Sequence, residues 1–180
     1  MLNLKPALSV FFAAAASVLS ACAVAGGGKD ARSSRLDVGA QTPALVATDQ
    51  NGKTVTLGVP GPVRVIYFYP KDGTPGCTAE ACAFRDVWDQ FTDAGVDVVG
   101  VSSNNERSHR TFAEKHALPF SLIADPKGIW SQAFGVATTF GITHRVSFLI
   151  DRDGKVAHVY PGVDPALHAE EVLGHARNLQ

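Results

Sequence analysis

The sequence lacks an excess of charge of either sign. Its 180 residues carry 16 basic and 17 acidic side chains, a formal net charge of -1, and only 18% of the residues are charged. Proteins that bind nucleic acids or anionic membrane surfaces through charge carry a basic surplus. We therefore expect a small molecule or another protein as the partner, and no nucleic acid.

A hydrophobic run long enough to span a membrane is also missing at the N-terminus. After Lys5, an uncharged and largely apolar stretch runs from Pro6 to Leu19, which is shorter than the roughly 20 residues that a span needs. A basic residue, a short apolar run and small residues in this order are typical of an export signal. Because Leu19-Ser20-Ala21-Cys22 resembles the bacterial lipobox, we expect residues 1–22 to be the signal and Cys22 to become a lipid anchor.

Two alternatives to the lipid anchor stay open. Cleavage after Ala21-Cys22-Ala23 would release a soluble protein that begins at Val24, and a retained transmembrane segment is the third possibility. With a lipid anchor or with soluble cleavage, the protein is exported to the periplasmic side of a bacterial membrane. The lipid-anchored form contacts the membrane only through its lipid. Residues 23–35 contain three consecutive glycines among polar residues, which predicts a flexible tether.

Repeats and further low-complexity segments are missing after residue 36. Hydrophobic residues make up 46% of the chain, which suits a single globular domain over residues 36–180. The β-branched and aromatic run Val63–Tyr69 predicts a central strand that is buried on both faces and ends at Pro70. Asn51-Gly52 predicts a hairpin within residues 45–57.

The remaining segments predict an alternation of helices and strands. Expected helices span 77–94, 105–116, 128–134 and 165–179, the last with Asp164 as its cap, and expected strands span 96–101, 120–124, 146–150 and 155–160. A β-α-β unit followed by β-β-α is the thioredoxin-like order. We therefore expect an α/β domain with a central mixed β-sheet flanked by helices and an N-terminal β-hairpin.

Cysteine is scarce, with three in the chain. If Cys22 carries a lipid, Cys77 and Cys82 are the only thiols of the folded domain. A lone pair in an oxidising compartment also suits a structural disulfide. Glu80 stands three residues after Cys77, so the Cys-x-x-Cys motif of a thioredoxin-like thiol-disulfide oxidoreductase is missing. An exported oxidoreductase of that kind remains the main alternative, ahead of a metallochaperone.

The histidines do not suggest a metal site. His109 and His116, like His168 and His175, stand seven residues apart, which is about 10 Å along a helix and too far for one ion to bind both. We expect no metal and no cofactor.

The residues around Cys77 point to thiol chemistry. Thr74 followed by Pro75 is typical of a helix start, with a capping hydroxyl and then proline in the first turn. Cys77 is then expected in that first turn, where free amide groups and the positive end of the helix dipole favour the nucleophilic thiolate. The same amides can receive the negative charge that develops on the leaving oxygen of a peroxide.

Three segments together resemble one enzyme family. Pro70-x-x-x-Thr74-x-x-Cys77 resembles the peroxiredoxin active-site motif, and residues 69–86 are similar to the bacterioferritin-comigratory or Q-type subfamily. Residues 143–151 resemble the family segment that carries the active-site arginine, here Arg145. The resemblance implies a thiol peroxidase of antioxidant defence, which reduces hydrogen peroxide and organic hydroperoxides to water and alcohols.

The resemblance also implies roles for individual residues. Cys77 is the peroxidatic cysteine that becomes a sulfenic acid, and Cys82 is the resolving cysteine that forms a disulfide with it. Thr74 and Arg145 hold the peroxide oxygens and stabilise the thiolate, while Pro70 shields the pocket from water. Thr74 also suits a helix cap, Pro70 a strand end and Arg145 a surface charge. A thioredoxin-like dithiol protein is the implied reductant, and we expect a monomer.

The spacing of the two cysteines implies a conformational change. In an intact helix, five residues separate two Cα atoms by about 7.5 Å along the axis and about 140° around it. A disulfide tolerates Cα separations up to roughly 7 Å and needs side chains that point together. We therefore expect the first turns of the helix to unwind before Cys77 and Cys82 can bond.

Overall fold

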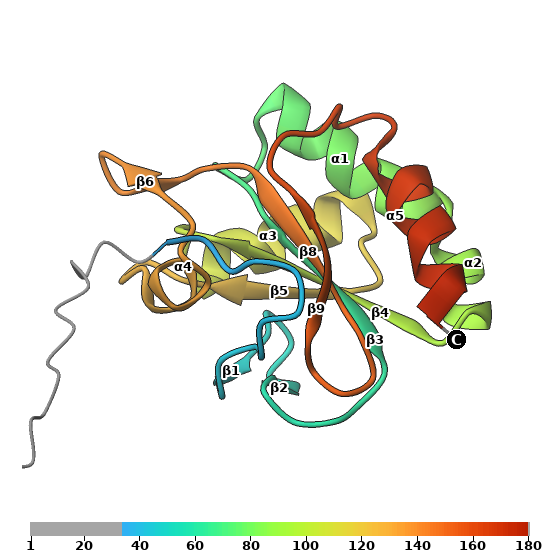
Figure 1. Cartoon of the computed structure of the whole chain (residues 1–180). Helices are drawn as coiled ribbons and strands as arrows, with labels where there is room; N and C mark the ends of the chain where they lie inside the picture. The colour runs from blue at the N-terminus through green and yellow to red at the C-terminus, as the bar shows by residue number, and fades with distance from the viewer. Residues whose placement is uncertain (1–33, 180) are drawn as a thin grey trace, which may run out of the picture. The chain divides into compact units, whose positions relative to one another are not determined.

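A five-stranded sheet with the strand order β5-β4-β3-β8-β9 forms the centre of the computed structural model, which describes residues 34–179 (Figure 1). Its strands are β3 (Val63–Phe68), β4 (Val96–Ser102), β5 (Ser121–Ala124), β8 (Val146–Ile150) and β9 (Val156–Tyr160). The β3-β4 and β4-β5 pairs are parallel, whereas β3-β8 and β8-β9 are antiparallel. The mixed sheet confirms the predicted thioredoxin-like class and places β3 at its centre.

Both faces of β3 are buried because successive side chains of a strand point to opposite sides. Val63, Val65 and Tyr67 join one apolar cluster, and Ile66 and Phe68 join the other. The first cluster includes side chains of four helices: α1 (Pro75–Asp86), α2 (Trp88–Asp93), α3 (Glu106–His116) and α5 (His168–Ala176). The second includes α4 (Ile129–Phe134) and the segment around β2 (Thr54–Thr56).

The predicted N-terminal hairpin is present. β1 (Val46–Thr48) pairs antiparallel with β2, and the Asp49 carboxylate accepts hydrogen bonds from the backbone amides of Asn51 and Lys53 in the turn. The Asn-Gly signal therefore located the turn correctly.

Two predicted helices differ from the structure. The helix expected over 77–94 is divided into α1 and α2 at Val87, where φ is -111° and ψ is 19°. The helix expected from Pro165 begins at His168, because the carbonyl of Asp164 accepts the amides of Leu167 and His168 and closes a turn before the helix. A short 3-10 helix, Arg177–Leu179, follows α5.

A second small hairpin, β6 (Thr138–Thr139) paired with β7 (Ile142–Thr143), was not predicted from the sequence. Its turn is Phe140-Gly141, with φ values of 51° and 76°. Phe140 is an uncommon residue for the left-handed region, so turn propensity did not reveal it. Its side chain is fully exposed.

The expected export signal, Cys22 and most of the expected tether lie outside the described residues. Between residues 34 and 179, no helix is long and apolar enough to cross a membrane. The described chain contacts the domain from its beginning, since the amide of Leu36 donates to the carbonyl of Phe134 at 3.0 Å.

Candidate active site

Cys77 lies in the first turn of α1, directly beyond the carboxyl end of β3. Pro75 is the first residue of the helix and Thr74 stands at the N-cap position, as the sequence predicted. The Cys77 side chain is 2% exposed and is a free thiol. The fold therefore holds a buried free thiol in the first turn of a helix, next to the positive end of the helix dipole.

Arg145 is the cation next to this thiol. It immediately precedes β8, which pairs with β3, and its Nη2 donates to Cys77 Sγ at 3.2 Å. Two residues that are 68 positions apart in the sequence are therefore in contact. A guanidinium cannot lose its proton in proteins, so it provides a permanent positive charge beside the sulfur.

A buried carboxylate links Arg145 to the last helix. Arg145 Nη1 forms an ion pair with Glu80 Oε2, and His168 Nδ1 lies 2.9 Å from Glu80 Oε1. The side chains of Glu80 and His168 are both 0% exposed. We call Cys77, Glu80, Arg145 and His168 the Glu80 cluster.

Sequence reasoning missed Glu80 and His168 as members of the site. A signal for Glu80 was available, since it stands one helical turn after Cys77 and the two share a helix face. A glutamate on the buried face of a helix needs a partner. The family resemblance already assigns Arg145 to the same site, so Arg145 was a candidate for that partner. His168 had no comparable local signal.

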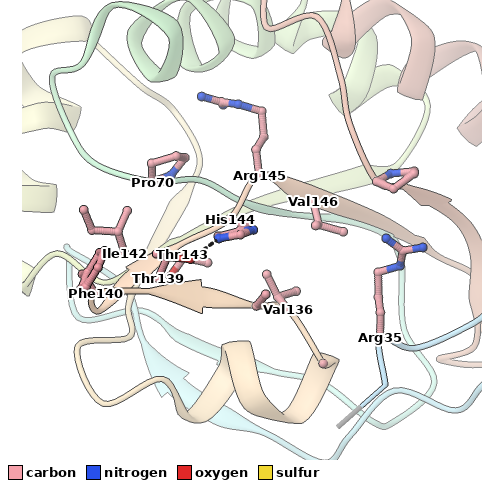
Figure 2. A pocket seen from close by; sticks show the side chains of 13 residues that line it. Arg35, Pro70, Val136, Thr139, Phe140, Ile142, Thr143, His144, Arg145 and Val146 are labelled. Atoms are coloured by element: carbon pink, nitrogen blue, oxygen red, sulfur yellow. Dashed lines mark hydrogen bonds between the residues drawn. The ribbon is translucent and has the colours of Figure 1, made fainter. Parts of the chain in front are cut away.

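Pro70 and Arg145 both line a pocket of about 620 Å³, shown in Figure 2. The β6-β7 hairpin supplies much of the remaining wall, including Phe140 and Ile142. His144 belongs to the same wall and is held by a hydrogen bond of 2.7 Å between its Nε2 and Thr139 Oγ1. An open pocket with apolar and cationic walls thus adjoins the arginine that contacts Cys77.

The hydroxyl of Thr74 does not cap the helix, contrary to the expectation from sequence. Its Oγ1 donates to the carbonyl of Lys71 at 3.1 Å instead, and α1 has no side-chain cap. The carbonyl of Thr74 still accepts the amide of Thr78 at 2.8 Å. The side chain therefore closes its own loop in this state.

Cys82 lies on a different side of α1 from Cys77. Its half-buried Sγ is 4.0 Å from Nδ1 of His116 at the end of α3, and Arg85 donates to the carbonyl of His116. Both cysteines are free thiols. The structure thus places them apart within one intact helix, as the spacing predicted.

A second buried carboxylate holds the loop between β3 and α1. Asp72 accepts hydrogen bonds from Tyr69 Oη and Ser108 Oγ, each at 2.7 Å, and it pairs with His109 Nδ1 at 3.0 Å. We call Tyr69, Asp72, Ser108 and His109 the Asp72 cluster. Burial acts to raise the pKa of Asp72, but the hydrogen bond and charge of His109 and the two hydroxyl donors outweigh it and lower that pKa. Asp72 is therefore an ionised anchor for the loop that carries Pro70 and Thr74.

Tyr67 lies beneath the site and keeps its hydroxyl proton at neutral pH. Burial, followed by the negative charges of Glu80 and Asp72, raises the pKa of Tyr67 well above its usual value. Its ring stacks on Phe84 of α1 with centroids 5.0 Å apart. Tyr67 therefore contributes packing under the helix.

A mixed thioredoxin-like sheet with a buried cysteine at a helix N-terminus, paired to an arginine, defines a class of thiol-dependent oxidoreductases. Residues 38–159 match the AhpC/TSA family. The match covers more than half of the chain, and the chain belongs to this family.

Relatives within the family are peroxiredoxins. The putative peroxiredoxin bcp of Coxiella burnetii is 39% identical over 147 residues, which cover 77% of this chain and 97% of the relative. Peroxiredoxin Bcp of Escherichia coli K12 is 39% identical over 146 residues, or 77% of this chain and 94% of the relative. These likenesses confirm the Bcp and Q-type resemblance and identify the chain as a peroxidase, an oxidoreductase.

Solved structures agree with this placement. Peroxidoxin BcpB of Mycobacterium tuberculosis superposes with a TM-score of 0.74 at 30% identity and covers 81% of this chain and 99% of its own. Peroxiredoxin Q of Xanthomonas campestris gives a TM-score of 0.71 at 33% identity, with 81% and 98% covered.

Proposed function

We propose that Cys77 is the peroxidatic nucleophile. The observation that carries this proposal is the 3.2 Å contact between Arg145 Nη2 and the buried Sγ of Cys77. The thiolate attacks one oxygen of a hydroperoxide, the O–O bond breaks, and the leaving oxygen takes a proton to become water or an alcohol. Cys77 is left as a sulfenic acid, and Arg145 stabilises the charge that moves from sulfur to oxygen.

Resolution follows through Cys82. Its thiolate attacks the sulfenic sulfur of Cys77, an S–S bond forms, and hydroxide leaves with a proton as water. Because both cysteines belong to α1 and Cys82 contacts His116, the helix must unwind between them first. A thioredoxin-like dithiol protein then reduces the disulfide and itself becomes oxidised.

We propose that the pocket lined by Arg145 receives the carbon chain of organic hydroperoxides. Pro70, Val136 and Ile142 provide apolar surface in this pocket. A structure of the bacterioferritin comigratory protein of Xanthomonas campestris, with a TM-score of 0.72 and 32% identity, concerns alkyl peroxide reduction. We propose both hydrogen peroxide and alkyl hydroperoxides as substrates here.

The decisive test uses mass spectrometry before and after one equivalent of peroxide. The wild-type protein should lose two thiols and show a peptide linked through Cys77 and Cys82. The Cys82→Ser variant should react with its first equivalent at a similar rate and accumulate sulfenic or sulfinic acid at Cys77. Cys77→Ser should not turn over, because a serine hydroxyl is barely ionised at neutral pH; turnover by that variant would refute the assignment.

The pocket residues are tested separately. Thr74→Val and Arg145→Ala should each slow the reaction with peroxide by about 10²-fold, since each removes a donor that we propose stabilises the developing charge. Thr74 must first exchange its bond with Lys71 for one with the peroxide. Wild-type rates in both variants would leave these two residues with structural roles alone.

We also propose that the protein is exported and lipidated at Cys22. The support is the sequence Leu19-Ser20-Ala21-Cys22 after a short apolar run. Labelled palmitate should enter the protein in a bacterial host, and Cys22→Ala should prevent this. An unlabelled mature protein that begins at Val24 would show soluble export instead.

A further inference from the structure

His168 is completely buried against the active-site helix. It is the first residue of α5, and its imidazole lies against the rings of Phe84 and Tyr160, with centroids 5.3 and 5.5 Å away. Its Nδ1 lies 2.9 Å from Glu80 Oε1, and both side chains are 0% exposed. The imidazole is therefore enclosed between two aromatic rings and the carboxylate of Glu80.

The hydrogen bonding of the imidazole defines which nitrogen carries the proton. No described protein atom bonds to the buried Nε2 of His168. A buried N–H without a partner is costly, whereas an N–H at Nδ1 can donate a hydrogen bond to Glu80 Oε1. His168 therefore donates from Nδ1 to the carboxylate.

Glu80 is held on both oxygens by residues outside its own helix. Oε1 accepts from His168 of α5, and Oε2 pairs with Arg145 before β8. A buried carboxylate is tolerated only when such partners satisfy it. Since the same guanidinium donates through Nη2 to Cys77, the position of Glu80 fixes where Arg145 presents its charge to the sulfur.

Glu80 also stands between the two cysteines in the sequence. All three residues belong to α1. When the segment from Cys77 to Cys82 unwinds, Glu80 leaves both Arg145 and His168. The two bonds that align Arg145 in the folded helix are therefore bonds that must break before the disulfide can form.

We propose that His168 is a positioning residue that acts through Glu80 on both half-reactions, in opposite directions. It favours the wound helix with Arg145 aligned, which speeds attack on peroxide, and it opposes unwinding, which slows resolution by Cys82. This inference rests on the proposed function for its second half. The contact between His168 and Glu80 would therefore lengthen the time that Cys77 spends as a sulfenic acid.

The test measures the two steps separately in full-length variants. His168→Leu removes the donor, whereas His168→Asn keeps an N–H close to the position of Nδ1. His175→Leu is the matched control on α5, because His175 bonds to Tyr160 and not to Glu80. Peroxide attack is followed by rapid-mixing fluorescence, and disulfide formation by acid quenching and mass spectrometry.

We expect His168→Leu to react with peroxide roughly tenfold more slowly and to form the disulfide roughly tenfold faster, as loss of a charge-assisted hydrogen bond allows. His168→Asn should lie closer to the wild type in both rates, and His175→Leu should change neither by more than about twofold. Opposed changes are not produced by general loss of structure, which would slow both steps.

Amide exchange keeps the inference independent of the disulfide. In the reduced proteins, amides of residues 77–82 should exchange faster in His168→Leu than in the wild type and the His175→Leu control. Equal exchange, or two rates that fall together, would overturn the role of His168. If the wild-type protein forms no Cys77–Cys82 linkage, only the resolution step is refuted. The amide exchange rates and the rates of peroxide attack would then still test whether His168 positions Arg145 through Glu80.

Discussion

The Glu80 cluster and the Asp72 cluster solve the same physical problem in two places. Each buries a carboxylate and satisfies it with a histidine, and the exposed fractions of the Glu80 and Asp72 side chains are 0% and 7%. They differ in where the carboxylate stands. Glu80 belongs to α1, which must unwind in the proposed cycle, whereas Asp72 belongs to the loop before α1.

This difference assigns a different task to each cluster. The partners of Asp72 lie on α3 and at the end of β3 and none belongs to α1, so the proposed unwinding of α1 need not break these contacts. His109 is itself held from its other side, since Nε2 lies 3.2 Å from the carbonyl of Ile123. The Asp72 cluster thus keeps the loop with Pro70 and Thr74 fixed, and α1 can reform from a defined starting point.

The largest effect is expected on stability when the Asp72 cluster is broken. Asp72→Asn leaves buried donors without their charged acceptor, which should lower the free energy of unfolding by about 3 kcal/mol. Urea unfolding followed by tryptophan fluorescence measures it, with the exposed Asp93→Asn as control. A loss below about 0.5 kcal/mol would show that the carboxylate is not an anchor.

Breaking the Glu80 cluster should instead affect the chemistry. In Glu80→Gln the guanidinium of Arg145 loses its charged partner, and the rate of peroxide attack should fall by about 10²-fold. Glu114→Gln, on the exposed side of α3, is the control. If Glu80→Gln reacts at the wild-type rate, Arg145 is aligned without this carboxylate.

The pH dependence of stability sharpens the comparison further. The pKa of Asp72 is lower in the folded protein than the ordinary value of 3.8. Its stabilising contribution is therefore complete above that ordinary value and is lost as pH falls through the folded pKa. The difference in unfolding free energy between wild type and Asp72→Asn should shrink from about pH 7 to about pH 2.5; a constant difference would contradict the ionised anchor.

The smallest effect is expected for Ser108→Ala. It removes one of the hydroxyl donors to Asp72 and should cost about 1 kcal/mol of stability. The rate of peroxide attack should stay within about twofold of the wild type, because Ser108 touches no member of the Glu80 cluster. Thr111→Ala, whose hydroxyl bonds to the backbone of its own helix, is the control.

Local patterns predicted most of the fold. The run Val63–Tyr69 identified the central strand because a strand buried on both faces is nearly continuously apolar, and Arg64 is the one charged residue in this run. The break between α1 and α2 at Val87 was not predicted, because neither glycine nor proline stands there and the helical spacing of apolar residues continues across it. The β6-β7 turn escaped for a similar reason, since phenylalanine is not a usual turn residue.

The candidate site was predictable only where its residues are local or belong to a motif. Thr74, Pro75 and Cys77 are adjacent, so helix-start chemistry located the thiol. The pairs that complete the site join residues 65, 88 and 37 positions apart, namely Glu80 with Arg145, Glu80 with His168 and Asp72 with His109. Contacts of that range depend on how strands and helices pack, which periodicity does not specify.

Arg35 lines the same pocket as Pro70 and Arg145. The described chain therefore enters the domain at the rim of the active site. Fully extended, the 13 residues from Ala23 to Arg35 reach at most about 45 Å. If Cys22 carries the lipid that we propose, this length is the farthest that the pocket-lining Arg35 can lie from its anchor.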